Sequence, residues 1–333
     1  MKTYNVYGIG HALVDIECHV DEPFLDAIGL QKGSMTLVDD HRQSLLTEQL
    51  KTRMIHRASG GSASNTMIGL AQLGGKCFHS CKIADDALGH FFTDDMRANG
   101  VENEALHCDT QQGTTGRCLV MITPDAERTL CTHLGVSETF SVENLSERHL
   151  AQSEYLYIEG YLVSSPTTCN AAIMAKNLAK THGVRTALTF SDVSMIQFFR
   201  SGMDALISGG IDLLFCNENE ALCYAGTDSL EVAIQRLKEI STAFCLTLGP
   251  RGALLYDQGS LLEIPGIKVN AVDTNGAGDL FAGAFLYGIT HNQSIAQSGH
   301  LAIQASAQLV TQYGARLQRD QAIAIKKNFG SAL

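Results

Sequence analysis

The sequence predicts an α/β fold, a doubly wound and mostly parallel sheet flanked by helices, with a small β-sheet lid. Two observations predict it: short apolar runs of strand length alternate with segments of helical pattern, and one β-rich stretch interrupts that alternation. Apolar strands between helices are typical of a parallel sheet that is covered on both faces. The 333 residues can bury a sizeable core, and we expect one domain over residues 1–333.

The elements of the alternating pattern follow in order. The expected strands cover residues 4–10, 155–159, 185–191, 211–216 and 244–248. The expected helices cover residues 62–73, with Ser62 as N-cap, and 167–181, 230–240, 280–287 and 294–310.

The β-rich stretch lies outside this alternation. Residues 117–123 and 128–133 read as two strands, and the proline and aspartate of the PDAE segment between them favour a turn, so we expect a hairpin. Residues 14–38 also depart from the pattern, with short strand-like pieces. Together, residues of about 14–38 and 108–135 are expected to form one small sheet that lies as a lid over a site.

Composition excludes several functional classes. The charge is 24 − 35 = −11, which argues against nucleic acid or an anionic membrane surface as partner. No run of about 18 apolar residues and no secretory signal is present, so we expect a cytoplasmic protein. The ten cysteines form no CxxC pair; Cys77, His79 and Cys81 lie close together but lack further zinc ligands, so reduced thiols are the expectation.

The strongest motif runs from Asp273 to Asp279, DTNGAGD, directly before an apolar helix. Its glycines let successive backbone amides point at one spot, and the helix N-terminus adds partial positive charge there. We expect Gly276, Ala277 and Gly278 to form an anion hole for phosphate or a developing oxyanion. Asp279 then stands in the first helical turn, where a carboxylate can take a proton from an attacking hydroxyl. The alternative is a tight turn with an acidic residue that favours the helix dipole.

Three weaker motifs also follow strands or open helices. Gly60 and Gly61 let a ligand approach the backbone, and Asn65 can offer a donor and an acceptor to a hydroxyl. Asn217 and Glu220 share one side of a helix start, where oxygen ligands suit Mg²⁺ through its waters, although a polar first turn would look the same. Residues 247–252 form a glycine-rich turn that cradles phosphates or merely connects two strands. In a parallel sheet these positions gather at the carboxyl edge, where ligands bind.

Two nucleotide-binding motifs are excluded. Residues 8–13 resemble half of a dinucleotide fingerprint, but position 13 is leucine and no helix clearly follows. A P-loop is absent, because Gly75 and Lys76 are followed by Cys77.

The DTNGAGD segment resembles the second signature of the ribokinase-like (PfkB) carbohydrate kinases, and residues 60–75 resemble the first. Asn217 and Glu220 match the family's N-x-x-E motif, and residues 247–252 match its nucleotide loop. The resemblance extends over nearly the whole chain in the right order. It implies a doubly wound core, a β-sheet lid, and ATP-dependent phosphorylation of a hydroxymethyl group with Mg²⁺ and possible use of K⁺.

The chain is most similar to the adenosine kinase branch, through residues 8–16, the Thr115-Gly116 pair and the Gly160-Tyr161 pair. This resemblance implies roles for individual residues. Asp279 would be the base, Arg128 would reach the transferred phosphoryl group, and the substrate would contact His11, Asp15, Leu37, Gly60, Gly61, Asn65 and Tyr161. ATP would contact Asn217, Glu220, Thr247, Gly249, Gly252 and His300, with Asn217 and Glu220 also holding Mg²⁺.

One departure leaves the substrate open. Nucleoside-specific members usually carry asparagine where this chain has His11, which is bulkier and can become charged. A nucleoside such as adenosine is the first hypothesis, and a free sugar such as ribose or fructose is the second. A non-catalytic regulator that binds nucleotide or sugar is the third, although a binding module needs no base such as Asp279. The expected partners are ATP and a small molecule, and the chain is expected to be a monomer or homodimer.

Overall fold

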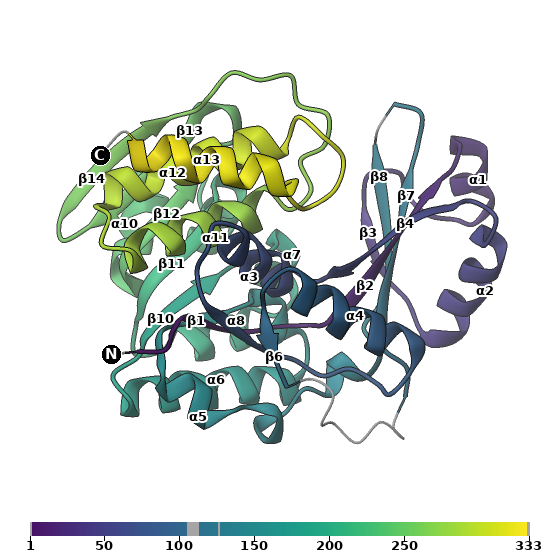
Figure 1. Cartoon of the computed structure of the whole chain (residues 1–333), viewed down its shortest axis with the longest axis horizontal. Coiled ribbons are helices and arrows are strands. Elements are labelled where there is room, and N and C mark those ends of the chain that lie inside the picture. The colour runs from purple at the N-terminus through teal and green to yellow at the C-terminus, as the bar shows by residue number, and fades with distance from the viewer. Residues whose placement is uncertain (1, 105–112, 126, 332–333) are drawn as a thin grey trace.

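A nine-stranded sheet forms the centre of the larger part of the molecule (Figure 1). The computed structural model describes residues 2–104, 113–125 and 127–331. The strand order is β14-β13-β12-β11-β10-β9-β1-β5-β6, and the pairings from β6 to β12 are parallel. The strands are β1 (Tyr4–Ile9), β5 (Cys77–Ser80), β6 (Glu102–Asn103), β9 (Ser153–Ile158), β10 (Arg185–Thr189), β11 (Ile211–Asn217), β12 (Ser241–Thr247), β13 (Gly252–Asp257) and β14 (Ser260–Pro265).

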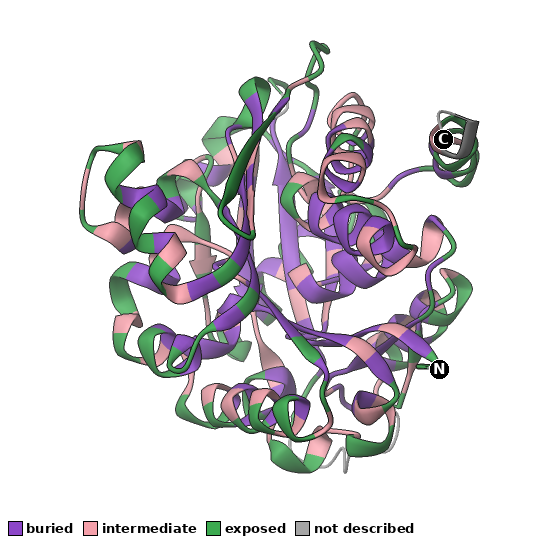
Figure 2. Cartoon of the chain, turned by 90° about the vertical axis from the view of Figure 1, so that its left-hand side faces the viewer, coloured by how far each residue is buried: buried purple, intermediate pink, exposed green. Residues whose placement is uncertain are grey.

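Helices cover both faces of this sheet, which confirms the doubly wound prediction. Along β11, Leu213 and Phe215 pack into one buried cluster, while Leu214 and Cys216 pack into the other, as the two-residue period of a strand requires. Figure 2 shows buried strands between helices whose outer surfaces are exposed. The first cluster includes residues of α3 (Ser62–Gln72), α4 (Ala87–Ala98), α11 (Ala277–Thr290), α12 (Ile295–Leu309) and α13 (Arg319–Ser331). The second includes residues of α5 (Glu147–Ala151), α6 (Pro166–Thr181), α7 (Val193–Phe198), α8 (Arg200–Ile207), α9 (Glu218–Ala225) and α10 (Leu230–Ile240).

The sequence pattern did not anticipate the antiparallel edge of the large sheet. After β12 the chain turns back into β13 and then β14, both antiparallel to their neighbours. Gly252 makes the first of these turns with φ +102°, and a Cβ there would lie 2.0 Å from the backbone oxygen of Ile264. The glycine-rich segment 247–252 therefore connects two strands, whatever else it does.

A second sheet of five strands stands beside the large one, in the order β3-β8-β7-β2-β4 (Figure 1). Its strands are β2 (Leu13–His19), β3 (Met35–Leu37), β4 (Met54–Gly60), β7 (Gly116–Ile122) and β8 (Arg128–His133). The antiparallel pair β7 and β8 is the expected hairpin, and segment 14–38 supplies most of β2 and all of β3. We call this five-stranded unit the small sheet. Strand β4 was not expected, and residues 108–112 and 126 of the expected lid lie outside the described residues.

Two helices pack on the outer face of the small sheet, α1 (Glu22–Ala27) and α2 (Asp40–Leu50). Leu25 and Leu46 are buried there in one cluster with Ile16 and Met121, whose strands supply the other half of this layer. The small sheet thus buries one face in apolar contacts that are continuous with the core of the large sheet, which leaves the other face to line a cavity.

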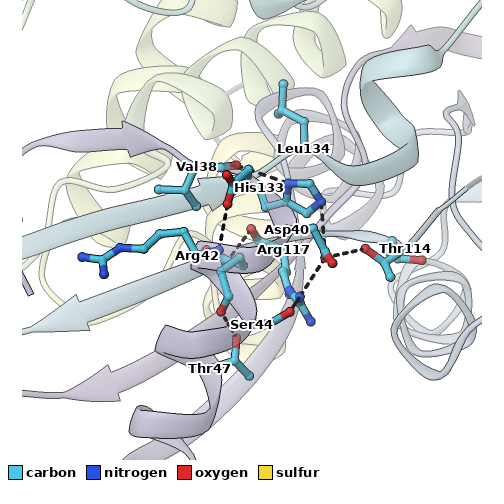
Figure 3. A network of polar contacts seen from close by, with 12 residues as sticks. Val38, Asp40, Arg42, Ser44, Thr47, Thr114, Arg117, His133 and Leu134 are labelled. Atoms are coloured by element: carbon cyan, nitrogen blue, oxygen red, sulfur yellow. Dashed lines mark hydrogen bonds and ion pairs between the residues drawn. The ribbon is translucent and has the colours of Figure 1, made fainter.

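Polar contacts fasten α2 to the hairpin (Figure 3). Asp40 Oδ1 lies 3.2 Å from Arg117 Nη2 of β7 and 3.6 Å from His133 Nε2 of β8, and it accepts a hydrogen bond from Thr114 Oγ1 at 3.3 Å. Arg117 also donates to Ser44 Oγ at 3.0 Å. These contacts join the helix layer to both strands of the hairpin, so the small sheet and α2 form one structural unit.

Candidate active site

A cavity of about 390 Å³ lies between the carboxyl edge of the large sheet and the inner face of the small sheet. Its floor is built by residues at the carboxyl ends of β1, β9, β10, β11 and β12 or just beyond them, and by the first turns of α3, α9 and α11. Twelve of the sequence-predicted site residues line it: His11, Asp15, Leu37, Gly61, Asn65, Tyr161, Asn217, Glu220, Thr247, Gly276, Gly278 and Asp279. Residues up to 268 positions apart in the chain (279 − 11) therefore meet in one place.

Asp279 lies in the first turn of α11 and faces the start of α3. Its Oδ1 accepts a hydrogen bond from Ser62 Oγ at 2.6 Å, and its Oδ2 accepts one from Asn65 Nδ2 at 3.3 Å. Burial raises the pKa of Asp279 to about 6, while these two donors act in the opposite direction. A carboxylate whose pKa is near neutrality, in a cavity at the sheet edge, can act as a general base.

A glycine turn leads into α11. Gly276 is the N-cap of α11 with φ +72°, and a Cβ there would lie 2.6 Å from the Cβ of Ala315, so this position requires glycine. Gly276 and Gly278 line the cavity. Ala277 does not, because its N–H donates to the Thr274 carbonyl at 3.2 Å. The helix N-terminus thus presents glycine backbone beside Asp279.

The inner face of the small sheet forms the opposite wall of the cavity. The lining residues alternate along each strand, so that one face of the sheet is turned to the cavity. In β2 and β3 they include Asp15 and Leu37, two of the predicted substrate contacts. The wall is mostly apolar, and its residues are Leu13, Asp15, Met35, Leu37, Cys118, Val120, Leu130, Thr132 and Leu134.

Two glycines allow the substrate-facing segments to come together. A Cβ on Gly60 would lie 2.2 Å from Asp15 Oδ1, so Gly60 makes room for that carboxyl rather than lining the cavity itself. Gly61 has φ +95°, and a Cβ there would lie 2.1 Å from the backbone oxygen of His11. Burial raises the pKa of Asp15 to about 7.

His11 is almost fully buried, at 2% exposure, where the chain leaves β1. Its Nδ1 lies 3.2 Å from Ser137 Oγ, and its Nε2 has no hydrogen-bond partner among the described residues. Burial lowers the pKa of His11 to about 4, so the ring is neutral near pH 7. The histidine therefore offers the cavity a neutral polar group.

Glu159 and Tyr161 follow β9 at the centre of the floor. Glu159 was missed by the sequence reasoning, although a lone carboxylate at the end of a buried strand was a usable signal. Its oxygens accept hydrogen bonds from the backbone N–H of His11 at 3.3 Å and of Ala63 at 2.8 Å. Burial raises the pKa of Glu159 to about 8. Tyr161 lines the cavity and donates its hydroxyl to the Ser191 carbonyl at 3.5 Å.

Asn217 and Glu220 form a capping box at the start of α9. Asn217 Nδ2 donates to Glu220 Oε1 at 2.7 Å, and the Asn217 N–H donates to Glu220 Oε2 at 2.9 Å. Burial raises the pKa of Glu220 to about 7. The polar first turn is thus present, and both side chains also line the cavity.

Arg128 does not line the cavity but joins the small sheet to the glycine turn. Its Nη2 lies 2.6 Å from Asp273 Oδ2 and 3.4 Å from Glu17 Oε1, in a buried cluster. Asp273 also accepts the N–H groups of Asn275 and Gly314. Sequence reasoning did not single out Asp273 as a site residue, and its carboxylate organises the loop that leads into α11.

The remaining predicted ATP contacts lie outside the cavity lining. Gly249 and Gly252 belong to the turn between β12 and β13, and His300 is exposed on α12. No group of three or more metal-ligating side chains was found in the described part of the chain, including the neighbourhood of Cys77, His79 and Cys81. None of the nine cysteines that the structure describes forms a disulfide.

The cavity is acidic. Its lining includes one histidine, His11, and the carboxyl groups of Asp15, Glu159, Glu220 and Asp279, and none of the described lining residues is a lysine or an arginine. With no cationic side chain in the described lining, the cavity does not balance the charge of an anionic small molecule, and a polyphosphate that enters it needs a cation from elsewhere.

Comparison with known proteins agrees with this geometry. The model of the pfkB family carbohydrate kinases matches residues 27–322, so the chain belongs to that family. It is therefore a phosphotransferase that acts on an alcohol group of a small nucleoside or sugar, with ATP as the phosphoryl donor. No helix in the described residues is long and apolar enough to cross a membrane.

The individual relatives include both adenosine kinases and sugar kinases. The chain is 35% identical to adenosine kinase from Sinorhizobium meliloti, with a TM-score of 0.89, and 33% identical to a probable sugar kinase from Rhizobium etli CFN 42, with a TM-score of 0.90; each match covers 98% of this chain and 99% of the other. It is also 25% identical to adenosine kinase 1 of Arabidopsis thaliana, covering 92% of this chain and 94% of that protein. The ribokinase of Haemophilus influenzae is 27% identical over 78% of this chain and 83% of that protein.

Proposed function

We propose that this enzyme transfers the γ-phosphoryl group of ATP to the hydroxymethyl group of a nucleoside such as adenosine, giving the 5′-monophosphate. The observation that carries the proposal is that a polar, catalytic surface and a mostly apolar surface line the same cavity. Asp279 and the Gly276–Gly278 turn supply the groups for phosphoryl transfer, while the apolar wall and Tyr161 offer apolar surface on which a flat ring can pack. A nucleoside has both a polar ribose and a flat apolar base.

The proposed mechanism starts with the sugar. Asp15, Gly61 and Asn65 bind the ribose hydroxyls, so that the hydroxymethyl oxygen lies beside Asp279. Asp279 accepts the proton of that hydroxyl as the hydroxyl oxygen attacks the γ-phosphorus of ATP, and the bond from the γ-phosphorus to the bridging oxygen of the β-phosphate breaks, so that ADP leaves. The backbone amides of Gly276 and Gly278 stabilise the negative charge that develops on the transferred group, whereas the Ala277 N–H already donates to Thr274. Arg128 contacts Asp273 in this structure and would have to leave that ion pair to reach the transferred group when ATP is present.

The nucleotide-binding part of the site is proposed from the positions of its residues in the fold and from the oxygen donors of their side chains. Thr247 and Gly249 would line the ATP phosphates, and His300 would lie near the adenine. Asn217 and Glu220 would hold Mg²⁺ through water, since oxygen donors beside an acidic cavity suit a hydrated divalent cation. Bound with ATP, Mg²⁺ would neutralise charge on the phosphates. K⁺ dependence, a monomeric or homodimeric state and a cytoplasmic location stay predictions.

A sugar kinase is the second candidate, and two polar groups of the floor favour it. His11 and Glu159 both line the cavity, and the unpartnered Nε2 of His11 offers a hydrogen bond beyond those from Asp15 and Asn65. Such an excess of polar groups suits ribose or fructose.

A phosphorylation screen decides between these candidates. The full chain, with ATP and Mg²⁺, is offered adenosine, other nucleosides, ribose, fructose and a phosphorylated sugar. We expect kcat/KM to be highest for adenosine and the phosphorylated sugar to be inactive, because the cavity is acidic. Higher kcat/KM for ribose or fructose would establish the second candidate, and binding without turnover for any compound would favour a regulator.

A further inference from the structure

Ser62 departs from the role that its sequence position predicts. It was expected to cap α3, but the N-cap is Gly61 and no side chain caps this helix. Ser62 is instead the first helical residue, and its hydroxyl donates to Asp279 Oδ1 at 2.6 Å, across 217 positions of the chain. A hydrogen bond from a neutral hydroxyl to a carboxylate is short and strong when the acceptor is charged.

Close packing of α3 against α11 makes this contact possible. A Cβ on Gly69 of α3 would lie 2.8 Å from Leu280 Cδ1, and a Cβ on Gly283 of α11 would lie 2.5 Å from the backbone oxygen of Thr66. The absence of side chains at Gly69 and Gly283 therefore lets the two helices approach closely. Only at such a short separation does a side chain as short as serine reach a carboxylate on the neighbouring helix.

Ser62 and Asn65 hold the carboxylate of Asp279 differently. The 2.6 Å contact from Ser62 is tighter than the 3.3 Å contact from the Asn65 amide. The other end of that amide, Asn65 Oδ1, is buried without a partner, so a bound substrate hydroxyl can engage Asn65. Ser62 then remains as the donor that fixes the orientation of the carboxylate.

We propose that Ser62 is the positioning residue for Asp279: its hydroxyl fixes one carboxylate oxygen, so that the other faces the hydroxymethyl group of the substrate. This inference rests on the proposed function, in which Asp279 is the base. The same hydrogen bond favours the ionised carboxylate, which a general base requires, and it opposes the effect of burial.

The direct test is a carboxyl titration of the unliganded full chain. The chain is labelled with ¹³C at the aspartate carboxyls, and Asp279→Asn identifies the Asp279 signal. In Ser62→Ala we expect the midpoint of Asp279 to rise by about one pH unit, as for a lost hydrogen bond to a charged group. Ser62→Thr keeps a hydroxyl and should retain the wild-type midpoint. The matched control is Ser64→Ala, because Ser64 is buried on the same helix but contacts His79 Nε2 instead.

Three results of the titration would overturn the proposal. These are an unchanged midpoint in Ser62→Ala, an equal rise in Ser62→Thr, and an equal rise in Ser64→Ala, which would show a general disturbance of α3. Because the titration requires no turnover, its result still tests the role of Ser62 if the phosphorylation screen identifies another substrate.

Kinetics then separate this inference from the proposed function. In Ser62→Ala we expect kcat to fall about tenfold with KM within about twofold, and the acidic limb of the kcat profile to move to higher pH. Wild-type kcat in Asp279→Asn would contradict the proposed base. Loss of kcat in Asp279→Asn together with a wild-type pH profile in Ser62→Ala would leave the base in place and overturn the role of Ser62.

Discussion

The floor and the wall of the cavity differ in chemistry and in construction. The floor comes from the large sheet and the helix starts at its edge, and it holds Glu159, Glu220 and Asp279, whose pKa values burial raises. The wall comes from one face of the small sheet and is mostly apolar, with Asp15 as its one carboxylate among the described lining residues.

This difference indicates which part of the cavity serves catalysis and which part serves substrate binding. A base and an anion hole need fixed geometry, and the floor takes both from α11 and its glycine turn, packed in the main core. An apolar surface that covers a ring and excludes water needs only shape, and the inner face of the small sheet supplies it. We therefore expect variants of Asp279 and its glycine turn to change kcat, and variants of the apolar surface, meaning the wall and Tyr161, to change KM.

Removal of Mg²⁺ should have the largest effect, because the acidic floor cannot neutralise ATP phosphates by itself. In excess chelator we expect kcat/KM to fall by on the order of 10³-fold or more, and added Mg²⁺ to restore it. Full activity in chelator would contradict the assignment of Asn217 and Glu220 to a hydrated metal.

Tyr161→Ala should weaken nucleoside binding more than sugar binding. Stacking of a base on an aromatic ring contributes about 1–3 kcal/mol, so KM for adenosine should rise about 5–150-fold while KM for ribose changes little. Steady-state kinetics with both substrates measure this. Equal changes for both would support the sugar kinase instead.

Leu37→Ala tests the apolar wall. Leu37 is 48% exposed and lines the cavity, so a bound base would cover it. Loss of its side chain removes apolar contact, and we expect KM for adenosine to rise about 3–10-fold with kcat within about twofold. Leu45→Ala is the control, because Leu45 is equally exposed at 48% on α2 and does not line the cavity. A fall in kcat without a change in KM would contradict the claim that the wall contributes to substrate binding rather than to catalysis.

Glu159→Gln tests the raised pKa of Glu159 through the pH dependence of thermal stability. The pKa of Glu159 is raised from 4.5 to about 8, so its contribution to stability is present below about pH 4.5 and is lost as the pH rises through about 8. The Tm of the unliganded chain should therefore decline between pH 5 and 8. In Glu159→Gln we expect a decline smaller by about 2–4 °C. Thermal unfolding across this range measures it, and identical declines would contradict the raised pKa.

Local patterns predicted much of the fold. The strands and helices of the alternating pattern appear with bounds shifted by a few residues, and the helix expected at 230–240 is α10 (Leu230–Ile240). The convergence on the carboxyl edge also followed from local pattern, because strand ends and helix starts were visible in the sequence. Strand β4 was missed because Ile55, His56 and Arg57 are all exposed, so this edge strand has no alternating apolar pattern.

Contacts between distant residues could not be predicted from local pattern. Ser62 looked like a helix cap in the sequence because of its position before an apolar helix. Its hydrogen bond to Asp279 joins residues 217 positions apart, so local pattern could not reveal it. The pairing of Arg128 with Asp273 depends likewise on how the small sheet stands against the large one. Gly60 was expected to touch substrate, whereas its place beside the Asp15 carboxyl follows from the pairing of β2 with β4.

The kinetics of Asp279→Asn test the central claim most directly. Asparagine keeps the shape of the side chain and cannot accept the proton. We predict that kcat falls about 10²–10⁴-fold, while ATP binding measured by calorimetry and Tm stay near wild type. Wild-type kcat, measured where phosphoryl transfer limits the rate, would contradict the claim that the floor of this cavity carries the catalytic base.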